Sequence, residues 1–246
     1  MFLLPETDLP LVFPDDFNTT SEGLLALGGN LHPETLIDAY SKGIFPWCSQ
    51  DDPLLWWHPN PRAVILPEEL HISRKICRLI KKNCHKYNTP ILSLHRDYTY
   101  VVTINNDFEN VITSCAKAPR KRQKGTWITN EIKNAYCTLH TMGYAHSVEV
   151  WDQNKNLVGG MYGIAMGRIF FGESMFSLKP NTSKLALLWL CKKLEENKFL
   201  ILDCQVESKH IMTLGARLIP RQKFMGYLVE GETFKKKPAA CFVPSS

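Results

Sequence analysis

The hydrophobic pattern of the chain is organised around the segment from Leu157 to Ser177, where five glycines and one carboxylate, Glu173, stand among apolar residues. An interior glycine weakens a helix by roughly 1 kcal/mol relative to alanine, so the pattern favours strands. In a strand, glycine is typical of a bulge or of a close approach to the backbone. The segment therefore predicts a β-hairpin that turns around Gly167, between two buried strands.

A helix and a further strand are predicted after this hairpin. Asn181 opens a helix-starting cluster that leads into a mostly apolar run, and residues 199–206 have the composition of a strand. Strand, helix and strand in this order indicate a crossover in a mixed or parallel sheet. Asp203 and Gln205 are two residues apart, so on a regular strand their side chains share a face. Because a buried carboxylate needs a partner, Asp203 belongs either to a structural network or to a site.

The remaining pattern predicts a mixed α/β protein. Further helices are expected at 33–42, 73–82, 107–117, 129–142 and 208–215, and further strands at 63–66, 98–104, 145–151 and 216–219. Residues 43–62 contain three tryptophans and four prolines, which predicts a rigid aromatic loop region. The tail after residue 219 is basic and is expected to end irregularly.

Composition narrows the class of protein. The chain has 246 residues, of which 44% are hydrophobic and 22% charged, as in a globular protein with a sizeable core. No apolar run approaches the roughly 20 residues that span a bilayer, and the first residues lack the basic region of a secretory signal. We therefore expect a cytoplasmic protein with no membrane partner. The eight cysteines are dispersed without a Cys-x-x-Cys pair, which argues against a zinc site or a disulfide framework.

The small excess of positive charge favours an anionic partner. The net charge is +5, and two basic groups stand out. One is the outward face of the predicted helix 73–82, with Arg74, Lys75 and Arg78. The other comprises Arg120, Lys121 and Arg122, shortly before an exposed-looking tryptophan, Trp127. Cations beside a stacking surface suit single-stranded nucleic-acid ends, although a solvated charge run is the alternative interpretation.

Eight short segments occur in order between residues 23 and 206. They are GLLALGGN (23–30), GIFPW (43–47), LWWHPNPR (55–62), GTWIT (125–129), HSVEVW (146–151), LVGGMYG (157–163), FGESMFS (171–177) and DCQV (203–206). Together they resemble the leucyl/phenylalanyl-tRNA-protein transferases, a bacterial family that adds Leu, Phe or Met from aminoacyl-tRNA to protein N-termini. Two departures are a more basic stretch at residues 120–124 and a longer segment at 84–97, for which we have no role.

The resemblance implies a small N-terminal α/β domain, residues 1–62, and a larger GNAT-like acyltransferase domain, residues 63–246. Trp47 and Trp127 would hold the 3′-terminal adenosine, and Glu173 would orient the aminoacyl group. Asp203 and Gln205 would form the catalytic pair. The residues implied to line the side-chain pocket are Met161, Phe170 and Leu187.

The implied partners are aminoacyl-tRNA and acceptor proteins that begin with Arg or Lys. The reaction is aminolysis of an ester by an α-amine, whose pKa of about 7.7–8.0 leaves roughly a tenth of it neutral at pH 7. The amine therefore needs an acceptor for its hydrogens and a fixed approach more than a strong base. A glutamine oxygen held by a carboxylate can supply both. No metal or cofactor is implied, because the chain has no metal cluster or nucleotide fingerprint, and a monomer is expected.

Two other functions remain open from the sequence. A GNAT-type N-acetyltransferase would use acetyl-CoA, but the chain lacks an Arg/Gln-x-x-Gly-x-Gly/Ala signature for the pyrophosphate. A non-catalytic RNA-binding module would use only the tryptophans and the basic groups. Loss of turnover on changing Gln205, with tRNA binding kept, would separate a transferase from such a module.

Overall fold

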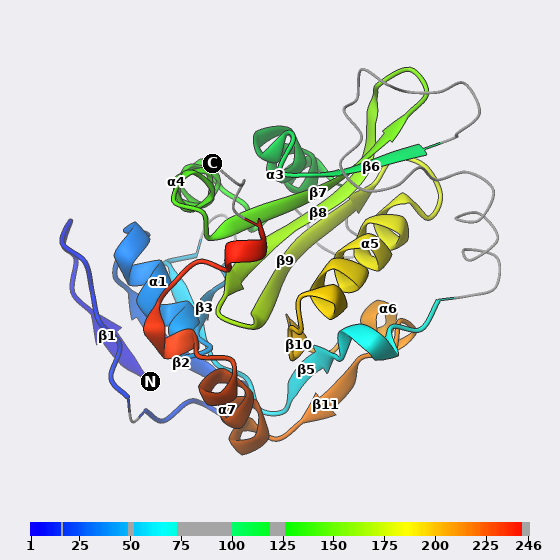
Figure 1. Ribbon diagram of the computed structural model, residues 1–246. Helices are drawn as coiled ribbons and strands as arrows, with labels where there is room; N and C mark the ends of the chain where they lie inside the picture. The colour runs from blue at the N-terminus through cyan, green and yellow to red at the C-terminus, as the bar shows by residue number, and fades with distance from the viewer. Residues whose placement is uncertain (16, 49–51, 73–99, 119–125, 243–246) are drawn as a thin grey trace.

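The computed structural model describes residues 1–15, 17–48, 52–72, 100–118 and 126–242, and it is a mixed α/β structure with two sheets (Figure 1). The four-stranded sheet is built entirely from the first 57 residues, and the seven-stranded sheet from residues after it. This arrangement agrees with the predicted fold class, in which a small N-terminal α/β part precedes a larger α/β part. Within the described residues, no helix combines the length and apolarity needed to cross a bilayer.

The small sheet holds the aromatic segment in place. Its order is β1 (Phe2–Leu4), β2 (Leu24–Gly28), β4 (Leu55–Trp57) and β3 (Phe45–Pro46), and helix α1 (Pro33–Ser41) follows β2. The prediction of a loop region across residues 43–62 is therefore wrong in part, since β3 and β4 pair with each other. The prolines argued against strands in this region, but Pro46 lies on the edge strand β3, where the missing N–H donor leaves no strand partner unpaired.

The large sheet has the order β11-β5-β10-β9-β8-β7-β6. Its strands are β5 (Arg62–Ile65), β6 (Tyr100–Ile104), β7 (Ala145–Asp152), β8 (Leu157–Met166), β9 (Ile169–Ser177), β10 (Ile201–Gln205) and β11 (Arg217–Ile219). The predicted hairpin is β8 and β9, with Gly167 in the turn at φ +56°. Within the described part of the large sheet, only β9 and β10 pair in parallel, and helix α5 (Thr182–Glu196) connects them, which confirms the expected crossover.

Helices cover both faces of the large sheet (Figure 1). A Cβ atom on Gly159 would meet Thr182 of α5, whereas one on the next residue, Gly160, would approach Val111 of α3 (Phe108–Lys117). Successive strand residues point to opposite faces, so α5 and α3 lie on opposite sides of the sheet. Helix α4 (Asn130–Thr141), capped by Thr129 as predicted, packs beside α3.

The C-terminal tail is more regular than expected. Helix α6 (Lys209–Met212) precedes β11, and α7 (Arg221–Glu230) follows it. Helix α7 was not predicted, because it buries only Phe224 and Leu228, four residues apart, which leaves a weak pattern in the sequence. Single 3-10 turns occur at Pro67–Glu69 (η1), Thr233–Lys235 (η3) and Ala240–Phe242 (η4).

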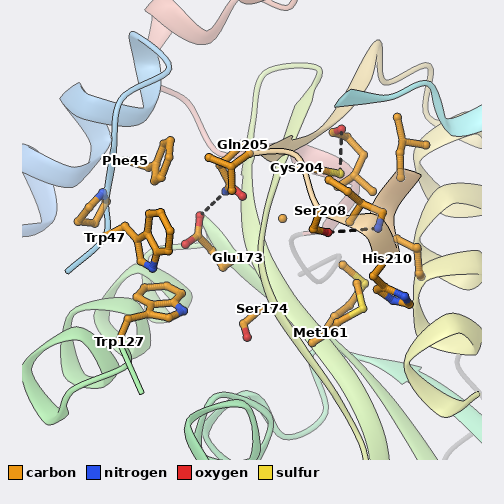
Figure 2. A pocket seen from close by; sticks show the side chains of 18 residues that line it. Phe45, Trp47, Trp127, Met161, Glu173, Ser174, Cys204, Gln205, Ser208 and His210 are labelled. Carbon is orange, nitrogen blue, oxygen red and sulfur yellow. Dashed lines mark hydrogen bonds between the residues drawn. The ribbon is translucent and has the colours of Figure 1, made fainter. Parts of the chain in front are cut away.

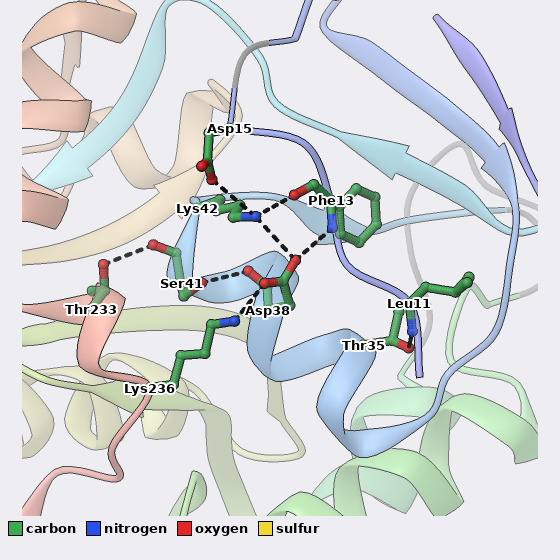
Figure 3. A network of polar contacts seen from close by, with 9 residues as sticks. All are labelled: Leu11, Phe13, Asp15, Thr35, Asp38, Ser41, Lys42, Thr233 and Lys236. Carbon is green, nitrogen blue, oxygen red and sulfur yellow. Dashed lines mark hydrogen bonds and ion pairs between the residues drawn. The ribbon is translucent and has the colours of Figure 1, made fainter. Parts of the chain in front are cut away.

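A buried carboxylate ties the tail to the start of the chain. Asp38 of α1 accepts a hydrogen bond from the Phe13 amide at 2.6 Å and pairs with Lys236 at 2.6 Å and Lys42 at 3.4 Å (Figure 3). The Asp38 side chain is only 3% exposed, so these contacts satisfy a charge that would otherwise be costly to bury. The network joins three segments that are far apart in sequence.

Candidate functional site

A cavity lined by aromatic, apolar and polar side chains lies where β9 and β10 stop pairing. Their parallel register covers only residues 169–171 and 201–203, whereas β10 ends at Gln205 and β9 continues to Ser177. A cavity of about 320 Å³ lies at this point, lined by β9 and β10 together with residues of the small sheet, α5 and α6 (Figure 2). The crossover topology therefore creates the opening, because the two parallel strands are held together at one end only.

Two β-bulges direct polar side chains at this opening. In β9, Gly172 and Ser174 pair with consecutive residues of β8, so Glu173 between them is the extra residue of a bulge. In β10, Asp203 and Gln205 pair with consecutive residues of β5, and Gln205 takes a left-handed φ of +59°. A bulge reverses the alternation of side chains along a strand. The prediction that Asp203 and Gln205 share a face is therefore wrong: Gln205 lines the cavity and Asp203 does not.

Glu173 is held by hydroxyl groups. It accepts hydrogen bonds from Tyr40 at 2.7 Å and Tyr136 at 3.1 Å, and the two tyrosine hydroxyls also bond each other. Gln205 Nε2 donates to the same carboxylate at 3.3 Å. Removal from water raises the pKa of Glu173 to about 7, although the tyrosine hydroxyls act to lower it. The carboxyl group therefore changes charge near neutral pH.

Asp203 is held by a cation. Arg62 Nε donates to Oδ1 at 2.9 Å and Arg62 Nη2 to Oδ2 at 2.7 Å, and both side chains are almost fully buried. The Arg62 guanidinium lies between the rings of Phe45 at 4.8 Å and Phe224 at 4.5 Å. Asp203 Oδ1 also accepts from the backbone amide of Gln205 at 3.0 Å. Asp203, which does not line the cavity, thus holds the backbone of Gln205 in place.

Aromatic residues form one end of the cavity. Trp47 follows β3, Trp127 precedes α4, and both side chains lie near Glu173 (Figure 2). Trp57 Nε1 donates to the Trp47 carbonyl at 2.6 Å, which fixes the chain there. Trp127 is only 8% exposed, so the interpretation of an exposed tryptophan is wrong, because packing in the core shared by the two sheets covers it.

Apolar residues form the other end. Met161 and Leu187 line it, beside Ile65 and Leu202. The expectation for Phe170 is wrong, since this residue does not line the cavity. Phe170 is 1% exposed and its ring centroid lies 5.7 Å from that of Phe242, so it belongs to the core under α5.

Several residues of the site were not predicted. They are Tyr40, Phe45, Arg62, Tyr136, Ser208 and His210. One sequence signal was available, because a tyrosine at a buried helix position needs a partner for its hydroxyl, and this applies to Tyr40 and Tyr136. Arg62 ends a quoted segment but gave no sign of its partner, which lies 141 residues away.

The predicted nucleic-acid contacts lie outside the described residues. These are Arg74, Lys75, Arg78, Arg120, Lys121 and Arg122, and the segment 84–97 lies outside them as well. Among the residues that the structure describes, no group of three His, Cys, Asp or Glu side chains is arranged to hold a metal ion.

Comparison with known proteins gives consistent matches along the chain. Residues 29–60 match the family model described as the leucyl/phenylalanyl-tRNA protein transferase N-terminal domain, and residues 64–229 match that of leucyl/phenylalanyl-tRNA protein transferase. The leucyl/phenylalanyl-tRNA–protein transferase of Lawsonia intracellularis is 50% identical over 216 residues, 88% of each chain. The one from Pseudomonas fluorescens SBW25 is 52% identical over 206 residues, 84% of each chain. L-PGS from Bacillus licheniformis, a solved structure, covers 68% of this chain and 48% of its own at 12% identity with a TM-score of 0.37, which is too low to support an argument.

Proposed function

This chain belongs to the leucyl/phenylalanyl-tRNA protein transferase family, and we propose on that basis that it transfers an amino acid from aminoacyl-tRNA to the N-terminal amine of a protein. One observation carries the proposal beyond family membership. A single cavity joins two tryptophans, an apolar end and the polar pair Glu173 and Gln205. An aminoacyl-adenosine has three matching parts, namely a base, an apolar side chain and a reactive ester between them.

The donor would lie along the cavity from the aromatic end to the apolar end. Trp47 and Trp127 offer ring surfaces for the terminal adenine, and stacking contributes roughly 1–3 kcal/mol per base. Met161 and Leu187 would contact the Leu, Phe or Met side chain, where each missing methylene loses about 1–3 kcal/mol. Glu173 lies between the two ends, where it would orient the aminoacyl group.

The reaction forms one C–N bond and breaks one C–O bond. The acceptor amine attacks the ester carbonyl carbon, and the ribose oxygen leaves and takes up a proton. Because Gln205 Nε2 donates to Glu173, its Oε1 is left to accept a hydrogen from the incoming amine. Positioning of the amine, rather than a strong base, is what the reaction requires.

Finer assignments rest on the same proposal. We propose acceptors that begin with Arg or Lys, Leu, Phe or Met as transferred residues, a monomer and a cytoplasmic location. We also propose a division into domains at residues 1–62 and 63–246, which is supported by the separate strand sets of the two sheets. The basic groups at Arg74 to Arg78 and Arg120 to Arg122 are proposed to meet tRNA phosphates.

The direct test is a transfer assay. Purified protein is mixed with tRNA charged with labelled Leu or Phe and with a peptide that begins with Arg or Lys. We expect label on the peptide without added ATP, and an otherwise identical peptide with an acetylated N-terminus as the control should stay unlabelled. Acetyl transfer from acetyl-CoA, with no transfer from active charged tRNA, would reverse the proposal.

A further inference from the structure

The backbone at Gln205 is held in an unusual conformation. Its φ of +59° lies in the left-handed region, which costs a residue with a side chain roughly 1–2 kcal/mol. The bulge in β10 also removes the regular ladder at this point. A conformation of this kind persists only where surrounding contacts fix it.

The fixing contact is made by Asp203. Its Oδ1 accepts the Gln205 amide at 3.0 Å, and that oxygen also accepts from Arg62 Nε at 2.9 Å. The second oxygen accepts from Arg62 Nη2 at 2.7 Å. A bidentate pair fixes the plane of the carboxylate as well as its position. The direction of the Gln205 amide is therefore set by Arg62 through Asp203.

Arg62 is itself immobilised from two sides. Phe45 and Phe224 contact the guanidinium within 5 Å of their ring centroids. Phe45 also lines the cavity next to Trp47, whereas Phe224 belongs to α7 and does not line it. The same cation thus contacts Phe45 of the small sheet and Asp203 beside the bulge of the large sheet.

We propose that Arg62 is a positioning residue for the transfer reaction. It holds Gln205 in the orientation that the amine needs and fixes its position relative to Phe45. The inference rests on the proposed transfer activity. Arg62 does not line the cavity, so it acts through Asp203 and Phe45. A merely structural ion pair would affect stability and leave the turnover of folded protein unchanged.

The main test is Arg62→Lys, which keeps the charge and loses the bidentate geometry. We expect kcat to fall about 100-fold while the KM for charged tRNA changes less than about threefold, because small misplacements of reacting groups have effects of that size. Lys236→Met is the matched control, since it removes a cation from Asp38 and neither of these residues lines the cavity. It should lower the melting temperature and leave kcat unchanged well below that temperature.

A second pair keeps the test decisive if Arg62→Lys does not fold. Phe224→Leu removes one ring from Arg62, and Leu228→Ala changes a buried neighbour one turn along α7. We expect kcat to fall about tenfold in Phe224→Leu and to stay at the wild-type value in Leu228→Ala. Wild-type kcat in folded Arg62→Lys or Phe224→Leu, or a change in KM alone, would overturn the inference. An inactive wild-type protein would instead refute the proposed function, so the two failures are distinguishable.

Discussion

Glu173 and Asp203 are carried by neighbouring strands and both contact Gln205, but their surroundings differ. Glu173 lines the cavity and accepts from two tyrosine hydroxyls and the Gln205 side chain. Asp203 is fully buried behind the cavity and accepts from Arg62 and the Gln205 backbone. Removal from water raises the pKa of Glu173 to about 7 although its hydroxyl partners lower it, whereas a bidentate cation fixes Asp203 in space.

The difference separates two tasks between two carboxylates. A carboxyl group that titrates near neutral pH can respond to the charge of an incoming amine. A carboxylate in a buried ion pair serves as a rigid support. The comparison predicts that substitutions at Asp203 act on the geometry and stability of the site, while substitutions at Glu173 act on its pH dependence.

The largest effect is expected for Asp203→Asn. The change leaves Arg62 buried without its counter-charge, which costs about 3–5 kcal/mol of folding free energy. We expect transfer turnover to fall about 100-fold as well, because Gln205 loses its support. Urea unfolding and steady-state kinetics measure the two effects. Asp38→Asn is the control, for which we expect a comparable loss of stability and normal turnover. An equal loss of turnover in both variants would contradict the role assigned to Asp203.

Gln205→Ala should remove turnover without a large loss of stability. We expect kcat to fall about 100-fold, since a positioned acceptor contributes on that scale, while charged tRNA still binds. Kinetics combined with a filter-binding measurement of tRNA affinity checks this. Cys204→Ala, the neighbouring cavity residue, should keep kcat within about threefold. Parallel loss of tRNA binding and turnover in Gln205→Ala would favour a binding role instead.

Glu173→Gln should change the pH dependence of transfer. Wild-type Glu173 becomes ionised as pH rises through about 7, so the wild-type rate should gain on the variant across that range. We expect a wild-type advantage of about tenfold at pH 8 and a smaller one at pH 6. Rates measured from pH 5.5 to 8.5 give the ratio. A ratio that is constant with pH would show that ionisation of Glu173 does not matter.

The same substitution has a predictable effect on stability. Glu173 has a folded pKa of about 7 against an unfolded value of 4.5, so between these pH values the folded state holds a proton that the unfolded state has lost. Stability therefore falls as pH rises through this window. Wild type should lose stability relative to Glu173→Gln from pH 5 to 7.5, which urea midpoints at several pH values measure.

Tyr136→Phe should have the smallest effect. The hydroxyl of Tyr136 acts to lower the pKa of Glu173, so its removal should move the midpoint of the pH profile upward. The plateau rate should change less than about threefold, because the carboxylate keeps its bonds to Tyr40 and Gln205. Midpoints fitted to rate profiles of both proteins check this, and a downward shift would contradict the assigned cause.

Much of the fold could be predicted because its signals are local. Caps, glycines and apolar spacing located α1, α3, α4 and the β8–β9 hairpin to within a few residues. The short strands β3 and β4 and the helix α7 were missed. Strands of two or three residues, and a helix that buries only two side chains, leave no clear periodic pattern. Their stability comes from pairing and packing with distant segments, which a local pattern does not encode.

The motifs and the hydrophobic pattern alone indicated the family, the crossover from β9 to β10 and six residues that line the cavity, namely Trp47, Trp127, Met161, Glu173, Leu187 and Gln205. The orientation of those side chains depends on the tertiary structure. Alternation along a regular strand would place Asp203 and Gln205 on one face, but a one-residue bulge in β10 puts them on opposite faces. Bulges and ion pairs such as Arg62 with Asp203 arise from hydrogen bonds between strands that are distant in sequence. Such bonds form only after the sheet has assembled, so the orientation of the site follows from the fold rather than from any single segment.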